Sequence, residues 1–106
     1  MKTRYFVTLT AALTFSTAAF AADGGEAAFK ASNCHACHAT DRKSVGPALK
    51  DIARKYAVDK DAQAKLEKKV RSGGSGAFGT MPMPATPKTV SDGDITAMVT
   101  WVLSLK

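Results

Sequence analysis

Residues 34–38 read C-H-A-C-H, and this stretch holds the only two cysteines of the 106-residue chain. A disulfide between Cys34 and Cys37 would close a very short loop and would therefore stabilise the fold little. A redox-active Cys-x-x-Cys pair is typical of alternating strands and helices, but no run of β-branched or aromatic residues after the first twenty residues predicts strands. A zinc site is not favoured either. Four donors within five residues leave no second segment of the chain to complete a tetrahedral coordination.

The remaining interpretation uses the histidine that follows the second cysteine. Cys-x-x-Cys-His is the attachment site of c-type haem, in which both thiols form thioethers to the porphyrin and the adjacent imidazole binds the iron. Two thioethers fix one edge of the porphyrin to a single turn of backbone, and this carries the next residue over the face of the ring. We therefore predict one covalent haem c, attached through Cys34 and Cys37, with His38 as an iron ligand and His35 facing solvent.

The first 21 residues have the pattern of an export signal: a positively charged start, an apolar run over residues 5–20, and a small-x-small ending. The apolar run is shorter than the roughly 20 strongly apolar residues that span a bilayer. We expect cleavage after Ala21 or Ala22. This would leave one domain over residues 22–106 in the periplasm, without stable insertion in a membrane.

The composition, 45% hydrophobic and 23% charged, is that of an ordinary globular domain. The full chain carries a net charge of +6, and removal of Lys2 and Arg4 would leave 13 basic against 9 acidic residues, a net charge of +4. A domain of about 85 residues has a marginal core, so a bound cofactor is expected to supply part of its stability. Nucleic acid is not expected as a partner, because the sequence lacks interleaved aromatic and basic residues.

A second iron ligand is expected in residues 80–84, which read T-M-P-M-P. Each proline favours an extended backbone at the methionine before it and lacks the N–H that a helix needs, so this segment predicts a stiff loop that presents two thioethers. A methionine that binds the iron from the second face of a haem fills the remaining coordination position and raises the reduction potential. Met81 and Met83 are both candidates on this argument, whereas Met98 lies in a helical apolar pattern and is expected in the core.

The apolar spacing after the leader predicts helices only. Asp23 to Glu26 resembles a capping box, Gly73 follows a helical stripe as a stop signal, and Ser91 is a helix start with Asp94 three residues on. We predict an all-α fold in which about four helices surround one haem, with helices over residues 23–32, 47–56 and 59–72 and from 91 towards the C-terminus.

These motifs together carry a family resemblance. The C-H-A-C-H stretch, V-G-P-A at 45–48, G-T-M-P-M-P at 79–84 and W-V-L-S at 101–104 resemble the small class I bacterial cytochromes c of the c-551 type, over essentially the whole chain after the leader. The resemblance implies that Met83 is the second iron ligand and that Met81 replaces an aliphatic residue. It also implies that the carbonyl of Pro47 accepts the free ring N–H of His38, a contact that fixes the histidine tautomer.

The resemblance also points to contacts with the haem propionates and with the methionine sulfur. Lys69 stands where the family uses an arginine on a propionate, and Arg71, two residues on, is a further candidate for this cofactor contact. Phe78 replaces a tryptophan that donates to a propionate in the family. Thr86 stands nearest to the position of an asparagine that lies close to the methionine sulfur.

An iron held by His38 and Met83 has no vacant position for a substrate, so we expect a one-electron carrier and not an enzyme. A haem peroxidase would instead need an open position and a distal acid–base residue. The resemblance implies a quinol-oxidising complex as donor, and a terminal oxidase, nitrite reductase or photosynthetic reaction centre as acceptor. Basic residues around the haem edge would steer a monomeric carrier to acidic patches on these redox proteins.

Overall fold

The structure is a computed structural model that describes residues 11–12 and 20–106. The expected leader falls almost entirely outside the described residues. Within the described part of the chain, no helix has the length and apolar character needed to cross a membrane. The elements are α1 (Phe20–Ala31), a short 3₁₀ turn η1 (Cys34–Ala36), α2 (Leu49–Lys55), α3 (Ala62–Ser72) and α4 (Asp92–Ser104).

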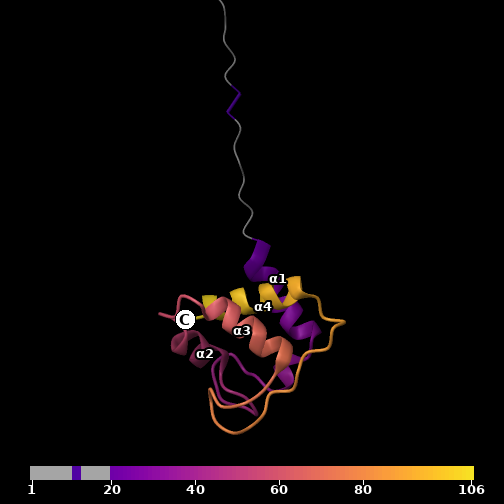
Figure 1. The fold of residues 1–106 in the computed structure, drawn as a ribbon. Coiled ribbons are helices and arrows are strands. Elements are labelled where there is room, and N and C mark those ends of the chain that lie inside the picture. Colours follow the sequence, from indigo (N-terminus) through magenta and orange to yellow (C-terminus); the bar gives the residue numbers. More distant parts are fainter. Residues whose placement is uncertain (1–10, 13–19) are drawn as a thin grey trace, which may run out of the picture.

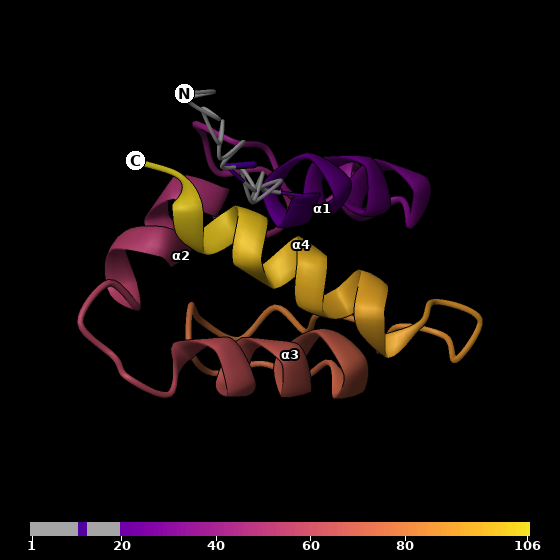
Figure 2. The ribbon, with the colours of Figure 1, turned by 90° about the horizontal axis from the view of Figure 1, so that it is seen from above.

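The C-terminal helix α4 is the central element of the fold. Figure 2 shows α4 lying between α1 and α3, with α2 near one end, and Figure 1 shows the long loops gathered on one side of the helices. Gly25 allows α1 to approach closely, because a β-carbon there would clash with the backbone carbonyl of Ala97 and with the β-carbon of Trp101. The rings of Phe29 and Trp101 pack beside this crossing, 5.3 Å apart and tilted by 56°.

The core joins all four helices, and α4 contributes most of it. Met98 is only 3% exposed, which confirms its prediction as a core residue. Leu103, in the same helix, is only partly covered and packs against the edge of the core. The buried cluster consists of Phe29, Leu49, Leu66, Ile95, Met98, Val99 and Val102.

Two predicted helix ends are confirmed. The Ser91 hydroxyl accepts a hydrogen bond from the backbone N–H of Asp94 at 3.1 Å and so caps α4. At the end of α3, Gly73 adopts a φ of 69°, a positive value that favours glycine, and its N–H donates to the carbonyl of Lys69 at 2.7 Å. Both signals are local in sequence, so they could be read without knowledge of the fold.

Three predicted helix starts differ from the structure. The first helix begins at Phe20, so Asp23 lies inside it and not at its start. The second begins at Leu49, and Pro47 precedes it in a loop. The third begins at Ala62, because the carboxylate of Asp59 accepts from the N–H of Asp61 at 2.9 Å and thereby holds a turn before the helix.

Candidate functional site

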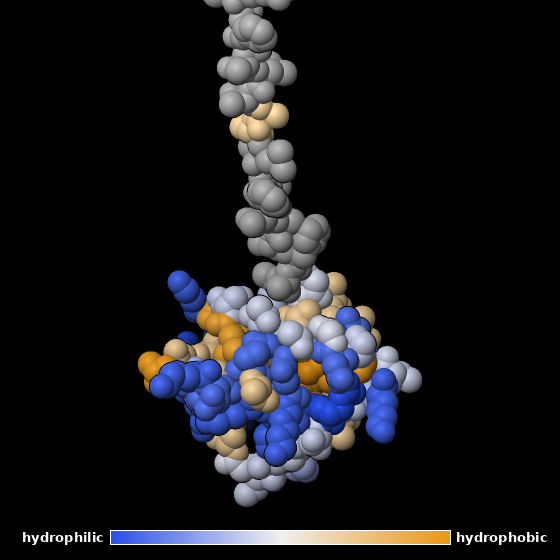
Figure 3. All heavy atoms as spheres, turned by 45° about the horizontal axis from the view of Figure 1, so that its top comes forward, coloured by the Kyte–Doolittle hydropathy of each residue, from blue (hydrophilic) through white to orange (hydrophobic). Residues whose placement is uncertain are grey.

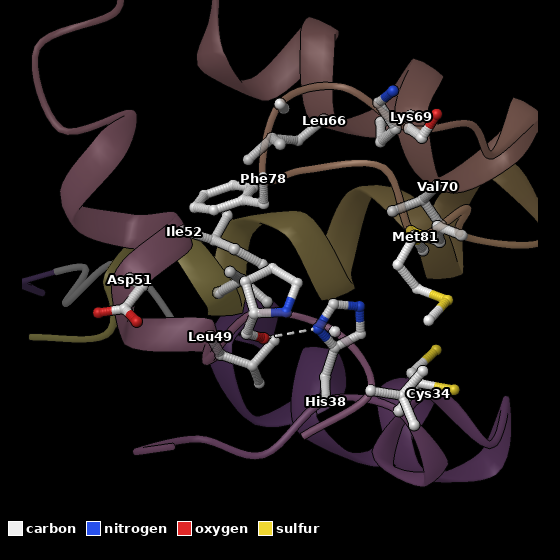
Figure 4. Close-up of a pocket in the computed structure, with 18 of the residues that line it drawn as sticks. Cys34, His38, Leu49, Asp51, Ile52, Leu66, Lys69, Val70, Phe78 and Met81 are labelled. Carbon is white, nitrogen blue, oxygen red and sulfur yellow. Dashed lines mark hydrogen bonds between the residues drawn. The ribbon is translucent and has the colours of Figure 1, made fainter. Parts of the chain in front are cut away.

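A cavity of about 740 Å³ opens between the helices and the two long loops. This volume lies within the roughly 300–1,000 Å³ of typical cofactor and ligand sites. Figure 4 shows Cys34 and His38 at one end of this cavity, with Leu66 and Phe78 at the other. The site therefore joins the N-terminal C-H-A-C-H stretch to the segment that follows α3.

The C-H-A-C-H stretch forms a single tight turn. Asn33 has a φ of 59° and reverses the chain after α1, and the N–H groups of Cys37 and His38 then both donate to the carbonyl of Cys34, at 3.2 and 3.0 Å. Both cysteines and His38 line the cavity as a result. His35 is exposed and does not line it, as expected for the inner residue of the motif.

The ring of His38 is fixed by its neighbours in the loop before α2. Its Nδ1 atom lies 2.8 Å from the carbonyl oxygen of Pro47, as the dashed line in Figure 4 shows. A carbonyl can only accept, so Nδ1 carries the hydrogen and Nε2 keeps the lone pair that a metal requires. A β-carbon at Gly46 would lie 2.6 Å from Cε1 of His38, so only glycine lets the backbone pass this close to the ring.

The methionine loop is attached to the end of α3 by the backbone. Gly74 and Met83 exchange two hydrogen bonds, each of 2.9 Å, in an isolated antiparallel bridge. Gly73 lies so close to this loop that a β-carbon would clash with the carbonyl of Met83 and with the backbone of residues 84–85. Met83 is partly buried and Met81 is 65% exposed, and both line the cavity.

The loop between Gly74 and Met81 is held at the cavity mouth by α2. The ammonium of Lys55 donates to the carbonyl of Ala77 at 2.6 Å and lies 4.7 Å from the ring centre of Phe78, a cation–π contact. Phe78 itself is 43% exposed and lines the cavity. The contact with Lys55 therefore links the exposed ring of Phe78 to the end of α2.

Six of the seven predicted cofactor-binding residues lie around the cavity. The structure does not bring Arg71 to it. The Arg71 guanidinium instead donates to carbonyls in the segment before α4 and pairs with Asp92 at 2.6 Å. The prediction that Arg71 contacts the cofactor therefore does not agree with the geometry. The six that line the cavity are Cys34, Cys37, His38, Pro47, Lys69 and Met83.

The apolar wall of the cavity fits the expectation that a cofactor completes the small core. It comes from α2 and α3, whose apolar side chains recur at helical spacing and form one face on each helix. That spacing indicates a buried face, but it does not tell whether the face meets another helix or a cofactor. The wall residues on these two helices are Leu49, Ile52, Leu66 and Val70, and Tyr56 directly after α2 adds to them.

The donor set fits a covalently attached haem. Both thiols are free and face the same cavity as a histidine whose Nδ1 is bonded to Pro47, so that the neutral ring keeps its lone pair on Nε2. Burial raises the pKa of the Cys34 thiol, which is opposite to the lowered pKa of reactive redox cysteines. Among the described residues, no group of three or more His, Cys, Asp and Glu side chains is arranged to hold a metal ion.

Comparison with known proteins agrees with this site. Residues 22–106 match the Cytochrome c family. The chain is 51% identical to cytochrome c-552 of Nitrosomonas europaea over 77 residues, which cover 73% of this chain and 74% of the relative. It is 45% identical to cytochrome c-551 of Pseudomonas aeruginosa over 85 residues, which cover 80% of each chain. The crystal structure of the Nitrosomonas europaea cytochrome c552 superposes with a TM-score of 0.73 at 48% identity, covering 76% of this chain and 99% of that chain.

The chain therefore belongs to the cytochrome c family, as a class I cytochrome c close to the c-551 and c-552 proteins. It has the all-α cytochrome c fold and carries haem c attached through Cys34 and Cys37. It is an electron carrier and not an enzyme. This confirms the predicted family, fold class and cofactor.

Proposed function

We propose that the chain is a periplasmic one-electron carrier whose haem iron is held axially by His38 and Met83. When bound, the haem supplies a reversible change between ferrous and ferric iron. His38 supports this role through its hydrogen bond to Pro47, which leaves Nε2 as the free donor. The observation that carries the proposal for Met83 is its bridge to Gly74, which fixes the register of the methionine loop at the cavity.

Met83 is preferred over Met81 because the two methionines differ in how the protein holds them. Both backbone groups of Met83 are bonded to Gly74, whereas Met81 lies two residues away at an exposed position. An axial ligand must keep its place in both oxidation states, and pairing of its own backbone reduces the freedom that it loses on binding. The exposed side chain of Met81 instead lies at the edge of the cavity.

The first prediction compares the two methionines directly. Met83→Ala should abolish the weak far-red absorption band that a methionine sulfur gives ferric haem, and it should let the ferrous protein bind carbon monoxide at neutral pH. Met81→Ala, the matched control, should keep the band and should not respond to carbon monoxide. If only Met81→Ala lost the band, the ligand would be Met81 and not Met83.

The proposal for the partners rests on charge. Without Lys2 and Arg4 the domain would carry 13 basic against 9 acidic residues, a net charge of +4. Lys43 and Lys69 line the cavity, and Lys55 lies at its mouth. Figure 3 shows a face of the molecule on which hydrophilic side chains predominate. We propose that these lysines steer the carrier, as a monomer, to acidic patches on redox proteins. The donor would be a quinol-oxidising complex, and the acceptor a terminal oxidase, nitrite reductase or reaction centre.

The second prediction tests the sign of the potential at the cavity with small redox probes. Oxidation by ferricyanide, an anion, should slow as ionic strength rises, and oxidation by a cationic cobalt(III) chelate should become faster. Lys43→Gln should slow the ferricyanide reaction, whereas Lys88→Gln, which is outside the cavity, should change it less. Rates that do not depend on ionic strength with both probes would contradict the steering proposal.

The same proposal includes export. The domain would begin after Ala21 or Ala22 once residues 1–21 are removed, and the family match begins at residue 22. Haem c is attached outside the bacterial cytoplasm, so the attachment motif requires the polypeptide to reach that compartment. The N-terminal sequence and intact mass of the protein purified from the periplasmic fraction would test the cleavage site.

A further inference from the structure

The segment between Met83 and α4 is attached to the last turn of α3 by side chains as well as by backbone. The hydroxyl of Thr86 donates to the carbonyl of Val70 at 2.6 Å, and the N–H of Thr86 donates to the carbonyl of Arg71 at 3.2 Å. Thr86 therefore docks against α3 through both its side chain and its backbone, only three residues after Met83.

Arg71 adds a second and wider attachment. One guanidinium nitrogen donates to the carbonyl of Pro87 at 3.0 Å and lies 3.5 Å from that of Thr86. The other donates to the carbonyl of Val90 at 2.8 Å and to the carboxylate of Asp92 at 2.6 Å. The planar guanidinium group suits this role, because its N–H groups can donate to several acceptors at fixed angles.

The electrostatics favour the same arrangement. Arg71 is in the last turn of α3, where a positive charge is stabilised by the helix dipole, and Asp92 is in the first turn of α4, where a negative charge is stabilised. The side chain of Asp92 is 96% exposed, whereas that of Arg71 is 28% exposed. The exposed ion pair is therefore worth little, and the contacts of the more buried guanidinium with the loop carbonyls dominate.

These contacts hold the chain on both sides of the proposed ligand. Met83 itself is bonded to Gly74, and the residues after it are bonded to Val70 and Arg71. We infer that Arg71 and Thr86 are positioning residues that keep the Met83 thioether in place at the haem iron. This inference rests on the proposed ligation by Met83.

The contact made by Thr86 also distinguishes two possible roles for its hydroxyl. A hydroxyl has one hydrogen to donate, and here it is directed to the Val70 carbonyl at 2.6 Å. It is therefore not available to the sulfur of Met83. Thr86 holds the methionine by anchoring the backbone and not by polarising the sulfur.

The test measures how easily an external ligand displaces the methionine. Imidazole is titrated into the ferric protein, well below the unfolding temperature, and loss of the far-red sulfur band is followed. Loss of a hydrogen bond to a charged donor should increase the apparent imidazole affinity of Arg71→Met by about tenfold. Thr86→Val, which keeps the shape and loses the hydroxyl, should increase it by a smaller factor, and Arg71→Lys should lie between the wild type and Arg71→Met.

Arg54→Gln is the control for loss of one positive charge, because Arg54 is an exposed residue of α2 that pairs with Asp51. It should leave the imidazole affinity unchanged. If Arg71→Met and Thr86→Val lower the unfolding temperature but leave the affinity at the wild-type value, the positioning role is overturned. An increase in Arg54→Gln as large as that in Arg71→Met would overturn it as well.

The same titration separates this inference from the proposed function. Met83→Ala should have no sulfur band and, with binding followed through the main haem absorption band, should bind imidazole most tightly of all variants. If the wild type itself lacked the band, or if Met83→Ala kept it, the proposed ligation would fail and the positioning role with it. If Met83→Ala behaves as expected and the Arg71 and Thr86 variants match the wild type, only the positioning role fails.

Discussion

At the scale of single residues, the site depends on backbone atoms as much as on the residues that carry the chemistry. The carbonyl of Pro47 selects the His38 tautomer that leaves Nε2 free. The N–H of Gly46 donates to the carbonyl of Cys37 at 2.7 Å, which brings the 44–47 loop against the attachment turn. The loop before α2 is thus folded onto the motif that it serves.

The third prediction concerns the space beside the histidine ring. Gly46→Ala would place a β-carbon 2.6 Å from Cε1 and 2.9 Å from Nδ1 of His38. Overpacking of this kind costs about 1–3 kcal/mol, which should lower the Tm by roughly 5–20 °C for a domain of this size. The shifted ring should also change the ferric haem spectrum.

Gly24→Ala is the matched control, because no atom lies within 4 Å of a β-carbon at this position in α1. Alanine is a better helix former than glycine, so Gly24→Ala should be neutral or slightly stabilising. A Gly46→Ala protein with the wild-type Tm and spectrum would show that the ring has room to move.

At the scale of elements, the parts that could be predicted from the sequence are those set by neighbouring residues. Ser91 and Gly73 mark helix ends because a cap forms within a few positions. The role of Arg71 could not be predicted in this way. Its acceptors lie 15–21 residues away in the sequence. They come within reach of the guanidinium only when α3 and α4 have packed together.

The seam between α3 and α4 shows the same dependence on packing. The amide of Gln63 donates to the carboxylate of Glu67 at 3.0 Å and to the carbonyl of Thr96 at 3.2 Å. Hydrogen bonds from the side chains of Thr96 and Gln63 lower the pKa of Glu67 below its ordinary value of 4.5. The folded state therefore favours the ionised carboxylate.

The fourth prediction follows from that direction. Since the folded-state pKa is depressed, Glu67 stabilises the fold above its ordinary pKa, and this contribution is lost as the pH falls through the folded-state pKa. Glu67→Gln should lower the Tm at pH 7, by no more than about 5 °C because the group is only partly buried and is screened by solvent. The difference between the variant and the wild type should be smaller at pH 3 than at pH 7. A difference of equal size at both pH values would exclude the carboxylate charge as its cause.

At the scale of the whole molecule, the cavity explains why the helices alone make a thin core. Leu49, Leu66 and Val99 are core residues and also line the cavity. The sequence predicted the attachment turn and the methionine loop, since both are short motifs. It also predicted that a cofactor completes the core, but which residues of α2 line the cavity depends on how distant helices pack.

The fifth prediction is that the haem acts as part of the core. Burial of a few hundred Å² of apolar surface is worth on the order of 10 kcal/mol, which is comparable to the whole net stability of a small domain. Cys34→Ala removes one of the two attachment points and should give a chain that unfolds at a much lower temperature and is degraded rapidly by protease. Circular dichroism melts and limited proteolysis would measure both effects.

His35→Ala is the control for this experiment, because it changes the same turn at an exposed side chain that does not line the cavity. It should attach haem and melt like the wild type. Both variants shorten a side chain within one 3₁₀ turn, but only Cys34→Ala removes an attachment point. A Cys34→Ala protein that is free of haem, helical and resistant to protease would show that the four helices are sufficient for the fold.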